Sequence, residues 1–335
     1  MSTCRTLLFA LMSGLVAACC WATDSAEPAE KAPVVEAEAP EILWLEDMSS
    51  AKAAARETGK PVYAFMYYIP APGERPEDDK RSLSCRRMRF ETFGDPEVRR
   101  LLSGFVCCAL DETAPDNREM ADKYALGVSK DPASKTRFGA LPANLFTDAH
   151  GDEHYIQWGY IPSAGFRWVL ENVLVLENAR TVLAEKPDDA RSNADLGAAM
   201  MELDLLKTCR EPLEKAVAAD PDNKVGARED ASLNLILLDV PDDLAAGFTR
   251  LSKYIEGLPE TREAQVSDNA LKARYYQAVT LYAQEGADKY KAALELLSWF
   301  KRLTPDSPQY RNRWATEAAK LDVLVRDTLA AANEK

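Results

Sequence analysis

Cysteine carries the most reactive side chain in this sequence, and Cys85 has the most suggestive neighbours. Four cationic residues flank it: Lys80, Arg81, Arg86 and Arg87. Nearby positive charge and the first turn of a helix both favour the thiolate, which is the nucleophilic form of cysteine. We expect Cys85 to lie in such a first turn. Two interpretations stay open: a reactive single thiol, or an inert and buried side chain.

The other cysteines offer less chemistry. Cys107 and Cys108 fall within an expected strand, where neighbouring side chains point to opposite faces, so they are poorly placed to bridge each other. Either would reach Cys85 only if the two backbones came within about 7 Å. The cysteine spacing fits no disulfide framework and no zinc module. We expect Cys107, Cys108 and Cys209 to pack in hydrophobic cores.

The two histidines, His150 and His154, stand four residues apart, a spacing that could hold a metal on a helix. Gly151 and the alternating residues around it predict a hairpin turn instead, so no metal site is expected. The sequence has no glycine-rich phosphate loop and no histidine beside a candidate nucleophile. No cofactor is predicted.

The elements that must position these residues alternate between strand and helix. Such alternation indicates an α/β sheet with helices on both faces. We expect Ser49 or Ser50 to cap the first helix, Gly59 to end it, and Pro96 to open a later one. The expected strands are 42–45, 62–68, 105–110, 143–148 and 153–160, and the expected helices are 51–58, 85–93, 117–125, one after residue 95 and one from residue 163.

The remainder of the chain is expected to be all helical. Pro187 and Pro221 are 34 residues apart, which is the tetratricopeptide period, and Leu196-Gly197 also resembles that repeat. We expect one good repeat, two looser helical pairs and a capping helix over 310–332. The aromatic residues of this part are expected to lie in its core: Tyr275, Tyr276, Trp299 and Trp314.

Six ordered segments of the first part resemble the thioredoxin-like family. They are GKPVYAFMY, SLSCRRMRFETFGDPEV, GFVCCALDE, ADKYALGV, LPANLFTDAHG and WGYIP. The resemblance covers about 120 residues and implies a central sheet with a motif of two cysteines at a strand-to-helix junction. Here that motif reads Ser82-Leu83-Ser84-Cys85, so serine replaces the first cysteine. An insertion between Ile69 and Arg81 also departs from the family.

The same resemblance assigns roles to further residues. Pro142 matches the cis-proline that lies opposite the motif and helps hold extended peptides. Tyr67 and Trp158 stand at strand ends near the motif, where they either line a peptide groove or complete the core. Dithiol exchange needs two sulfurs, and a serine hydroxyl stays protonated without a strong base beside it. Ordinary dithiol turnover is therefore not expected.

The first 22 residues are typical of an export signal, with Arg5 before an uncharged apolar stretch too short to span a membrane. Val16-Ala17-Ala18 before Cys19 resembles a bacterial lipobox, which implies lipid on Cys19. Cleavage after Ala22 is the alternative. Residues 23–41 predict a disordered tether, 42–175 the thioredoxin-like domain and 176–335 the helical repeats. We therefore expect an exported protein of the bacterial periplasm or cell envelope.

The net charge of −13 argues against nucleic acid as a partner, since an acidic chain gains nothing from counterion release. The sequence favours a binding or scaffold protein that holds a protein or peptide through the thioredoxin-like groove and the repeats. A membrane is a partner only through the lipid anchor. The alternative is a thiol-disulfide oxidoreductase or redox sensor that uses Cys85 alone.

Overall fold

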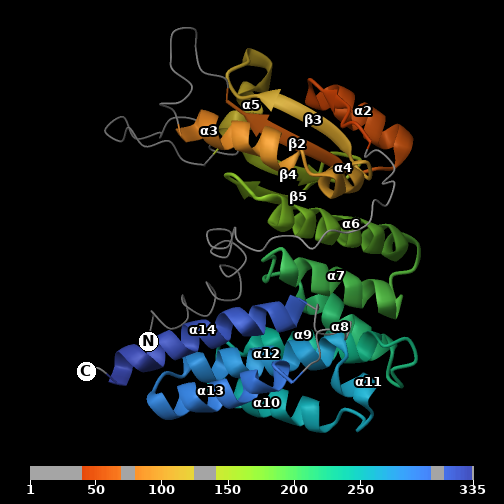
Figure 1. Ribbon diagram of the computed structural model, residues 1–335. Coiled ribbons are helices and arrows are strands. Elements are labelled where there is room, and N and C mark those ends of the chain that lie inside the picture. The colour runs from red at the N-terminus through yellow and green to blue at the C-terminus, as the bar shows by residue number, and fades with distance from the viewer. Residues whose placement is uncertain (1–39, 69–79, 124–140, 303–312, 334–335) are drawn as a thin grey trace, which may run out of the picture. The chain divides into compact units, whose positions relative to one another are not determined.

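The computed structural model describes residues 40–68, 80–123, 141–302 and 313–333 (Figure 1). The chain divides into two compact units between Asn178 and Ala179, inside helix α6 (Ser163–Glu185). The predicted leader, with Cys19, and the tether up to residue 39 lie outside the described residues. The predicted domain boundaries stay predictions.

The first unit contains a five-stranded sheet in the order β1-β3-β2-β4-β5 (Figure 1). Strands β1, β3 and β2 run parallel, and β4 and β5 run antiparallel to their neighbours. This mixed sheet with flanking helices fits the thioredoxin-like domain that the resemblance implies. The strands are β1 (Trp44–Leu45), β2 (Val62–Tyr67), β3 (Val106–Asp111), β4 (Ala143–Thr147) and β5 (Glu153–Trp158).

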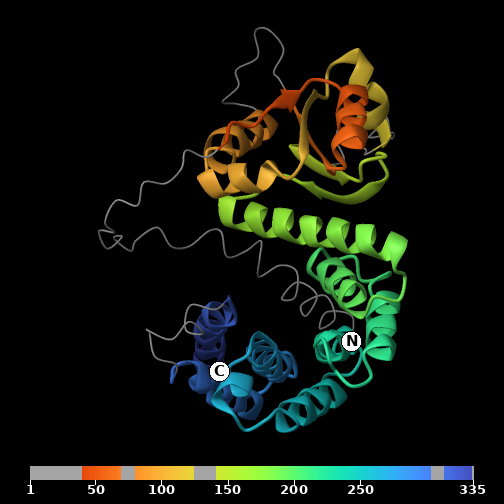
Figure 2. The ribbon, with the colours of Figure 1, turned by 90° about the vertical axis from the view of Figure 1, so that its right-hand side faces the viewer.

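Both faces of the sheet are buried, which explains the nearly continuous apolar run of β2. On one face Ala64 and Met66 pack in a cluster with Ala51 of helix α2 (Met48–Thr58). On the other face Tyr63 contacts the rings of Phe93 and Phe166. Figure 2 shows α6, which carries Phe166, running alongside the sheet. We call these the aliphatic face and the aromatic face.

Local capping explains the ends of the first helices. Asp47, rather than Ser49 or Ser50, caps α2, because its carboxylate accepts the backbone N–H of Ser50 at 2.8 Å. The predicted cap was therefore wrong by two or three residues. Gly59 ends α2 in the left-handed conformation, as predicted. Helix α4 (Pro96–Leu102) begins at Pro96, also as predicted.

The motif helix α3 (Lys80–Arg87) continues into a wide π-helical turn, η3 (Met88–Thr92). The N–H of Phe93 bonds the carbonyl of Met88, five residues back, at 3.0 Å. The buried hydroxyl of Thr92 donates to the carbonyl of Ile161 at 2.6 Å, which ties η3 to the start of α6. The sequence predicted a continuous helix through this stretch. Two short helical elements complete the unit, η4 (Pro115–Asn117) and α5 (Arg118–Lys123).

The second unit is helical, as expected. Its core contains Tyr275 and Trp314, both 4% exposed, and Tyr276 and Trp299 pack against that core. Its helices are α7 (Ala190–Glu202), α8 (Arg210–Ala219), α9 (Ala227–Asp239), α10 (Leu244–Glu256), α11 (Arg262–Gln265), α12 (Asp268–Ala283), α13 (Ala287–Phe300) and α14 (Arg313–Asn333). None of the helices in the described ranges is both long enough and apolar enough to cross a membrane.

Helices α7 and α8 approach closely at Gly197, where an added Cβ would lie 2.5 Å from the side chain of Leu213. Small residues at such a position permit tight pairing of the helices. Helices α7 and α9, which follow Pro187 and Pro221, begin at Ala190 and Ala227, so the helix starts do not keep the 34-residue interval that separates the two prolines. The tetratricopeptide assignment therefore stays a prediction.

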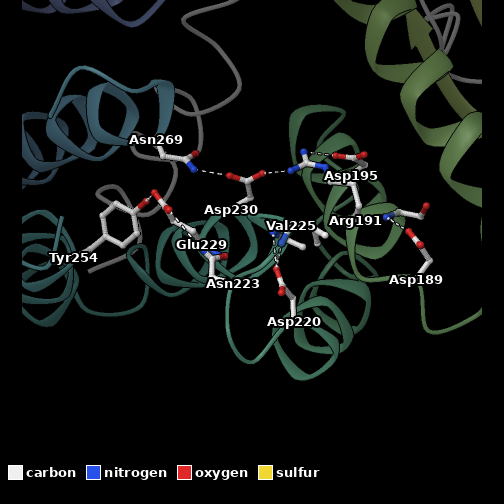
Figure 3. A network of polar contacts seen from close by, with 12 residues as sticks. Asp189, Arg191, Asp195, Asp220, Asn223, Val225, Glu229, Asp230, Tyr254 and Asn269 are labelled. Atoms are coloured by element: carbon white, nitrogen blue, oxygen red, sulfur yellow. Dashed lines mark hydrogen bonds and ion pairs between the residues drawn. The ribbon is translucent and has the colours of Figure 1, made fainter. Parts of the chain in front are cut away.

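Polar side chains join three helices of this unit (Figure 3). Arg191 of α7 bonds both Asp195 on its own helix and Asp230 of α9, and Asn269 of α12 donates to Asp230. Each charged group of this chain of contacts has at least one partner of opposite charge. The network therefore links three helices without leaving a charge unpaired.

Candidate functional site

Cys85 lies in the second turn of α3, because that helix already includes Lys80. The predicted first-turn position was wrong. The charged residues at 80 and 81 are good helix formers, and no proline or glycine separates them from Cys85. Helix-end charge effects fall off within the first turn, so the support they give a thiolate is small here. Cys85 is 3% exposed and packs in the aliphatic cluster with Cys108 and Leu141.

Ser82 precedes Cys85 by about one turn of α3 and is also 3% exposed. The most exposed residue of the motif is Leu83, at 45%, and Ser84 is partly exposed. The most exposed side chain of this motif is therefore apolar, and neither the Ser82 hydroxyl nor the Cys85 thiol is presented to solvent.

Pro142 lies at the beginning of β4, and its peptide bond with Leu141 is cis. The backbone N–H of Gly159 donates to the carbonyl of Pro142 at 2.7 Å, which joins the end of β5 to this segment. Leu141 shares a buried cluster with Cys85. The structure thus brings the candidate proline and the candidate thiol to the same end of the sheet.

Tyr67 and Trp158 lie at that same end but on opposite faces. Met66 pairs with Ala143, and Ala143 pairs with Trp158, so these three side chains share the aliphatic face. Tyr67 follows Met66 and therefore points to the aromatic face, where it stacks on Phe65 at 5.6 Å. The two rings do not form one wall of a groove.

Cys107 and Cys108 lie side by side in β3, point to opposite faces and form no disulfide. Burial raises the pKa of each thiol to about 12. Cys209 is likewise buried, and burial raises the pKa of its thiol. These three cysteines pack in cores, as expected.

His154 sits on β5 between two carboxylates, with Nδ1 against Glu177 of α6 and Nε2 at 3.8 Å from Asp148. His150 lies in the turn before β5, away from any strand. Across the described residues, no group of three histidine, cysteine, aspartate or glutamate side chains is arranged to hold a metal. The contact with Glu177 could not be predicted from the sequence, because 23 residues separate it from His154.

A polar cluster covers the outside of η3. The guanidinium of Arg87 lies 3.9 Å from the ring centre of Tyr160 and pairs with Glu91, and the Tyr160 hydroxyl donates to Glu91 at 2.6 Å. Burial and the bond to Glu91 raise the pKa of Tyr160 to about 12. These contacts hold the π-helical turn against the segment that follows β5.

A cavity of about 470 Å³ opens on the aromatic face, between the sheet and the η3–α4 segment. Of the predicted site residues only Tyr67 lines it. The sequence did not predict the other lining residues, because they come from segments that are distant in the chain and the π-helical turn has no simple sequence signature. Among them are Trp44, Phe65, Phe90, Arg89, Arg99 and Ala109.

Comparison with solved structures shows a similarity to a thioredoxin from Thermus thermophilus, known from its solution structure. The similarity covers 42% of this chain and 94% of the thioredoxin, with 22% sequence identity and a TM-score of 0.32. No protein-family profile matches the chain. No curated protein matches it in sequence.

Proposed function

We propose that this protein is an exported binding protein whose thioredoxin-like unit holds a protein or peptide partner without thiol turnover. One observation carries the proposal: the motif keeps a single thiol, Cys85, and that thiol is 3% exposed. Thiol-disulfide exchange begins with attack by an accessible thiolate on a disulfide sulfur. A buried thiol with serine at the partner position has neither the access nor the second sulfur.

The exposed side chains at the motif end of the sheet are suited to binding. Leu83 is 45% exposed and Trp158 is 46% exposed, although both are large and apolar. Aromatic side chains are over-represented among the residues that dominate protein interfaces. We propose that these two residues contact the partner.

Native-state alkylation tests the chemical part of this proposal. The full chain is treated with iodoacetamide between pH 6 and pH 9, and modification is read by peptide mass spectrometry. We expect Cys85 to be labelled only after denaturation, with Cys209 as the internal control for a buried thiol. Rapid labelling of native Cys85 below pH 7 would instead support the single-thiol oxidoreductase or redox sensor.

An activity assay adds a second readout. Reduction of insulin by dithiothreitol is followed with the wild type, Cys85→Ser and Cys209→Ser. We expect all three to match the uncatalysed rate. Catalysis by the wild type that Cys85→Ser abolishes and Cys209→Ser retains would show that the binding-only proposal is wrong.

Peptide binding tests the remaining part. Peptides selected from a displayed random library on the full chain are measured by fluorescence anisotropy. We expect Cys85→Ser to change their Kd by less than about twofold, and Trp158→Ala to weaken it at least about tenfold, as for a central interface aromatic. Val323→Ala is the matched control, because Val323 is exposed on α14. Loss of binding in Cys85→Ser would count against the proposal.

We further propose export and attachment of lipid to Cys19, supported by the apolar leader and the residues before that cysteine. Expression in a bacterial host with an alkyne-labelled fatty acid provides the test. We expect label in the wild type and none in Cys19→Ala, with Cys20→Ala as control. An unlabelled wild type found outside the cytoplasm would support cleavage after Ala22 instead.

A further inference from the structure

The cavity on the aromatic face has the size of a small-molecule site. Its volume of about 470 Å³ falls within the range of roughly 300–1,000 Å³ that is usual for ligand pockets. It lies near the ends of β1 and β2, apart from the buried thiol of Cys85, which packs on the aliphatic face. The cavity shares no lining residue with the proposed peptide-binding residues Leu83 and Trp158.

Aromatic rings form much of the cavity wall. Trp44 lies 6.0 Å from Phe65 between ring centres, and Phe65 stacks on Tyr67. Phe90 also lines the cavity and is 78% exposed, an unusual position for a phenylalanine. Such walls suit a flat or apolar ligand body, which would bury these rings further.

Two arginines, Arg89 and Arg99, line the same cavity, and neither forms an ion pair within the described part of the chain. Arg99 donates one N–H to the carbonyl of Gly94 at 3.2 Å, while its Nε is buried without a hydrogen-bond partner. A buried donor that lacks an acceptor costs free energy, which an acceptor on a ligand would recover. In a chain of net charge −13, two arginines without carboxylate partners in one cavity are notable.

Two glutamates, Glu41 and Glu46, also line the cavity. Both are exposed, and neither bonds Arg89 or Arg99 in the described structure. They leave the guanidinium groups available to an acceptor that enters the cavity.

We propose that this cavity binds a small carboxylate with an aromatic body, the ring against Trp44 and Tyr67 and the carboxylate on Arg99 and Arg89. Guanidinium groups bind carboxylates through charge-assisted hydrogen bonds that are about twice as strong as neutral ones. The aromatic walls select the ligand body and the arginines select its charge. The contribution of the arginines and that of the aromatic walls can be tested separately.

Calorimetric titration of the full chain with two probes of nearly equal shape tests the charge. The probes are indole-3-acetate and its neutral amide, indole-3-acetamide, at low ionic strength. We expect the carboxylate to bind at least about tenfold more tightly than the amide, because only the carboxylate forms charge-assisted bonds. Equal affinities, or no detectable binding of either probe at millimolar concentration, would overturn the proposal.

Substitutions then locate the site. In Arg99→Met the preference for the carboxylate should fall to about twofold or less. Arg100→Met is the matched control, since Arg100 is the next residue of α4, is exposed and pairs with Glu97. An equal loss in both variants would mean general electrostatic attraction rather than this cavity.

A third variant tests the volume without touching any charge. Ala109 of β3 lines the cavity, so Ala109→Phe should fill part of it and weaken both probes at least about tenfold. Circular dichroism verifies that the variant is folded. Unchanged binding of both probes by folded Ala109→Phe would place the binding elsewhere and refute the assignment.

Discussion

Two cation sites, one in each unit, are built in opposite ways. In the helical unit Lys272 of α12 lies 3.5 Å from Glu202 of α7 and donates to Asn234 of α9 at 2.9 Å. Arg313 of α14 pairs with the same Glu202 at 2.9 Å. In the sheet unit Arg99 has no carboxylate partner and lines a cavity, and its Nε is buried without a partner, as are those of Arg250 and Arg274 in the helical unit.

The difference separates two uses of charge. A buried ion pair that satisfies all its members holds helices in one arrangement, and breaking it is costly. An arginine without a carboxylate partner gains no ion pair within the fold, which leaves its charge available to a ligand. Charges paired within the fold are therefore structural here, and unpaired charges beside a cavity are candidates for binding.

The largest effect should come from Glu202, whose side chain is 19% exposed. Glu202→Ala leaves Lys272 and Arg313 without their shared carboxylate, and we expect a loss of about 3 kcal/mol in the free energy of opening of α12. Hydrogen exchange of α12 peptides measures this free energy. Glu211→Ala is the control, because its partner Lys215 is exposed and the pair adds little. Similar losses in both variants would remove the distinction between buried and exposed pairs.

Lowering the pH should make the opening of α12 easier, because Glu202 becomes protonated. Burial alone would raise the pKa of Glu202, but the charges of Lys272 and Arg313 outweigh it and hold that pKa below its usual range. The unfolded chain therefore binds the proton more readily, so the stabilisation is complete above about pH 4.3 and is lost as the pH falls through the lower folded value. Opening of α12 measured from pH 6 to pH 3 should show this loss. In Glu202→Ala the pH dependence of opening should be smaller, and an unchanged dependence would contradict this assignment.

Replacing Arg99 should change the free energy of unfolding of the sheet unit less than Glu202→Ala changes the opening of α12. Arg99→Met keeps the apolar stem and removes both a buried N–H without an acceptor and the hydrogen bond to the Gly94 carbonyl, so the stability of the sheet unit should change by no more than about 1 kcal/mol. Urea unfolding followed by hydrogen exchange of β3 peptides provides the measurement, with Arg100→Met as control. A loss above about 1 kcal/mol would mean that Arg99 supports the fold.

The smallest effect is expected for Arg191, whose side chain is 49% exposed although it contacts two aspartates (Figure 3). Exposed pairs contribute little, so Arg191→Met should cost about 0.5 kcal/mol, and 1 M salt should abolish that cost. Thermal unfolding at low and high salt tests this. A cost that persists in salt would make this network structural in the same way as Glu202.

Local chemistry accounts for the parts of the fold that the sequence predicted well. Apolar runs identified the strands, Gly59 and Pro96 marked helix ends, and the turn at Gly151 joined β4 to β5. Each of these signals acts within a few residues. The expected aromatic core of the helical unit also follows from local periodicity.

Contacts between distant segments account for the rest. The sequence predicted that Tyr67 and Trp158 lie near the Ser82–Cys85 motif, but the strand register shows that their side chains point to opposite faces of the sheet. Nothing in the sequence indicated that Arg99, Trp44 and Phe90 would line the same cavity. Composition shows that an arginine is present, whereas only the fold shows whether a carboxylate lies beside it.

The π-helical turn η3 has a consequence for how side chains are phased along the motif helix. Arg89 and Phe90 lie within this wide turn, and Phe93 follows it into the aromatic core. An ordinary helix advances about 100° per residue, so the extra residue in the turn shifts every later side chain around the axis. Deleting one residue of η3 would therefore rotate Phe93 around the helix axis relative to Arg89 and Phe90. The cavity residues and the core residue could then no longer both keep their positions. The wide turn acts as a one-residue spacer that lets a single helix serve the cavity and the core at once.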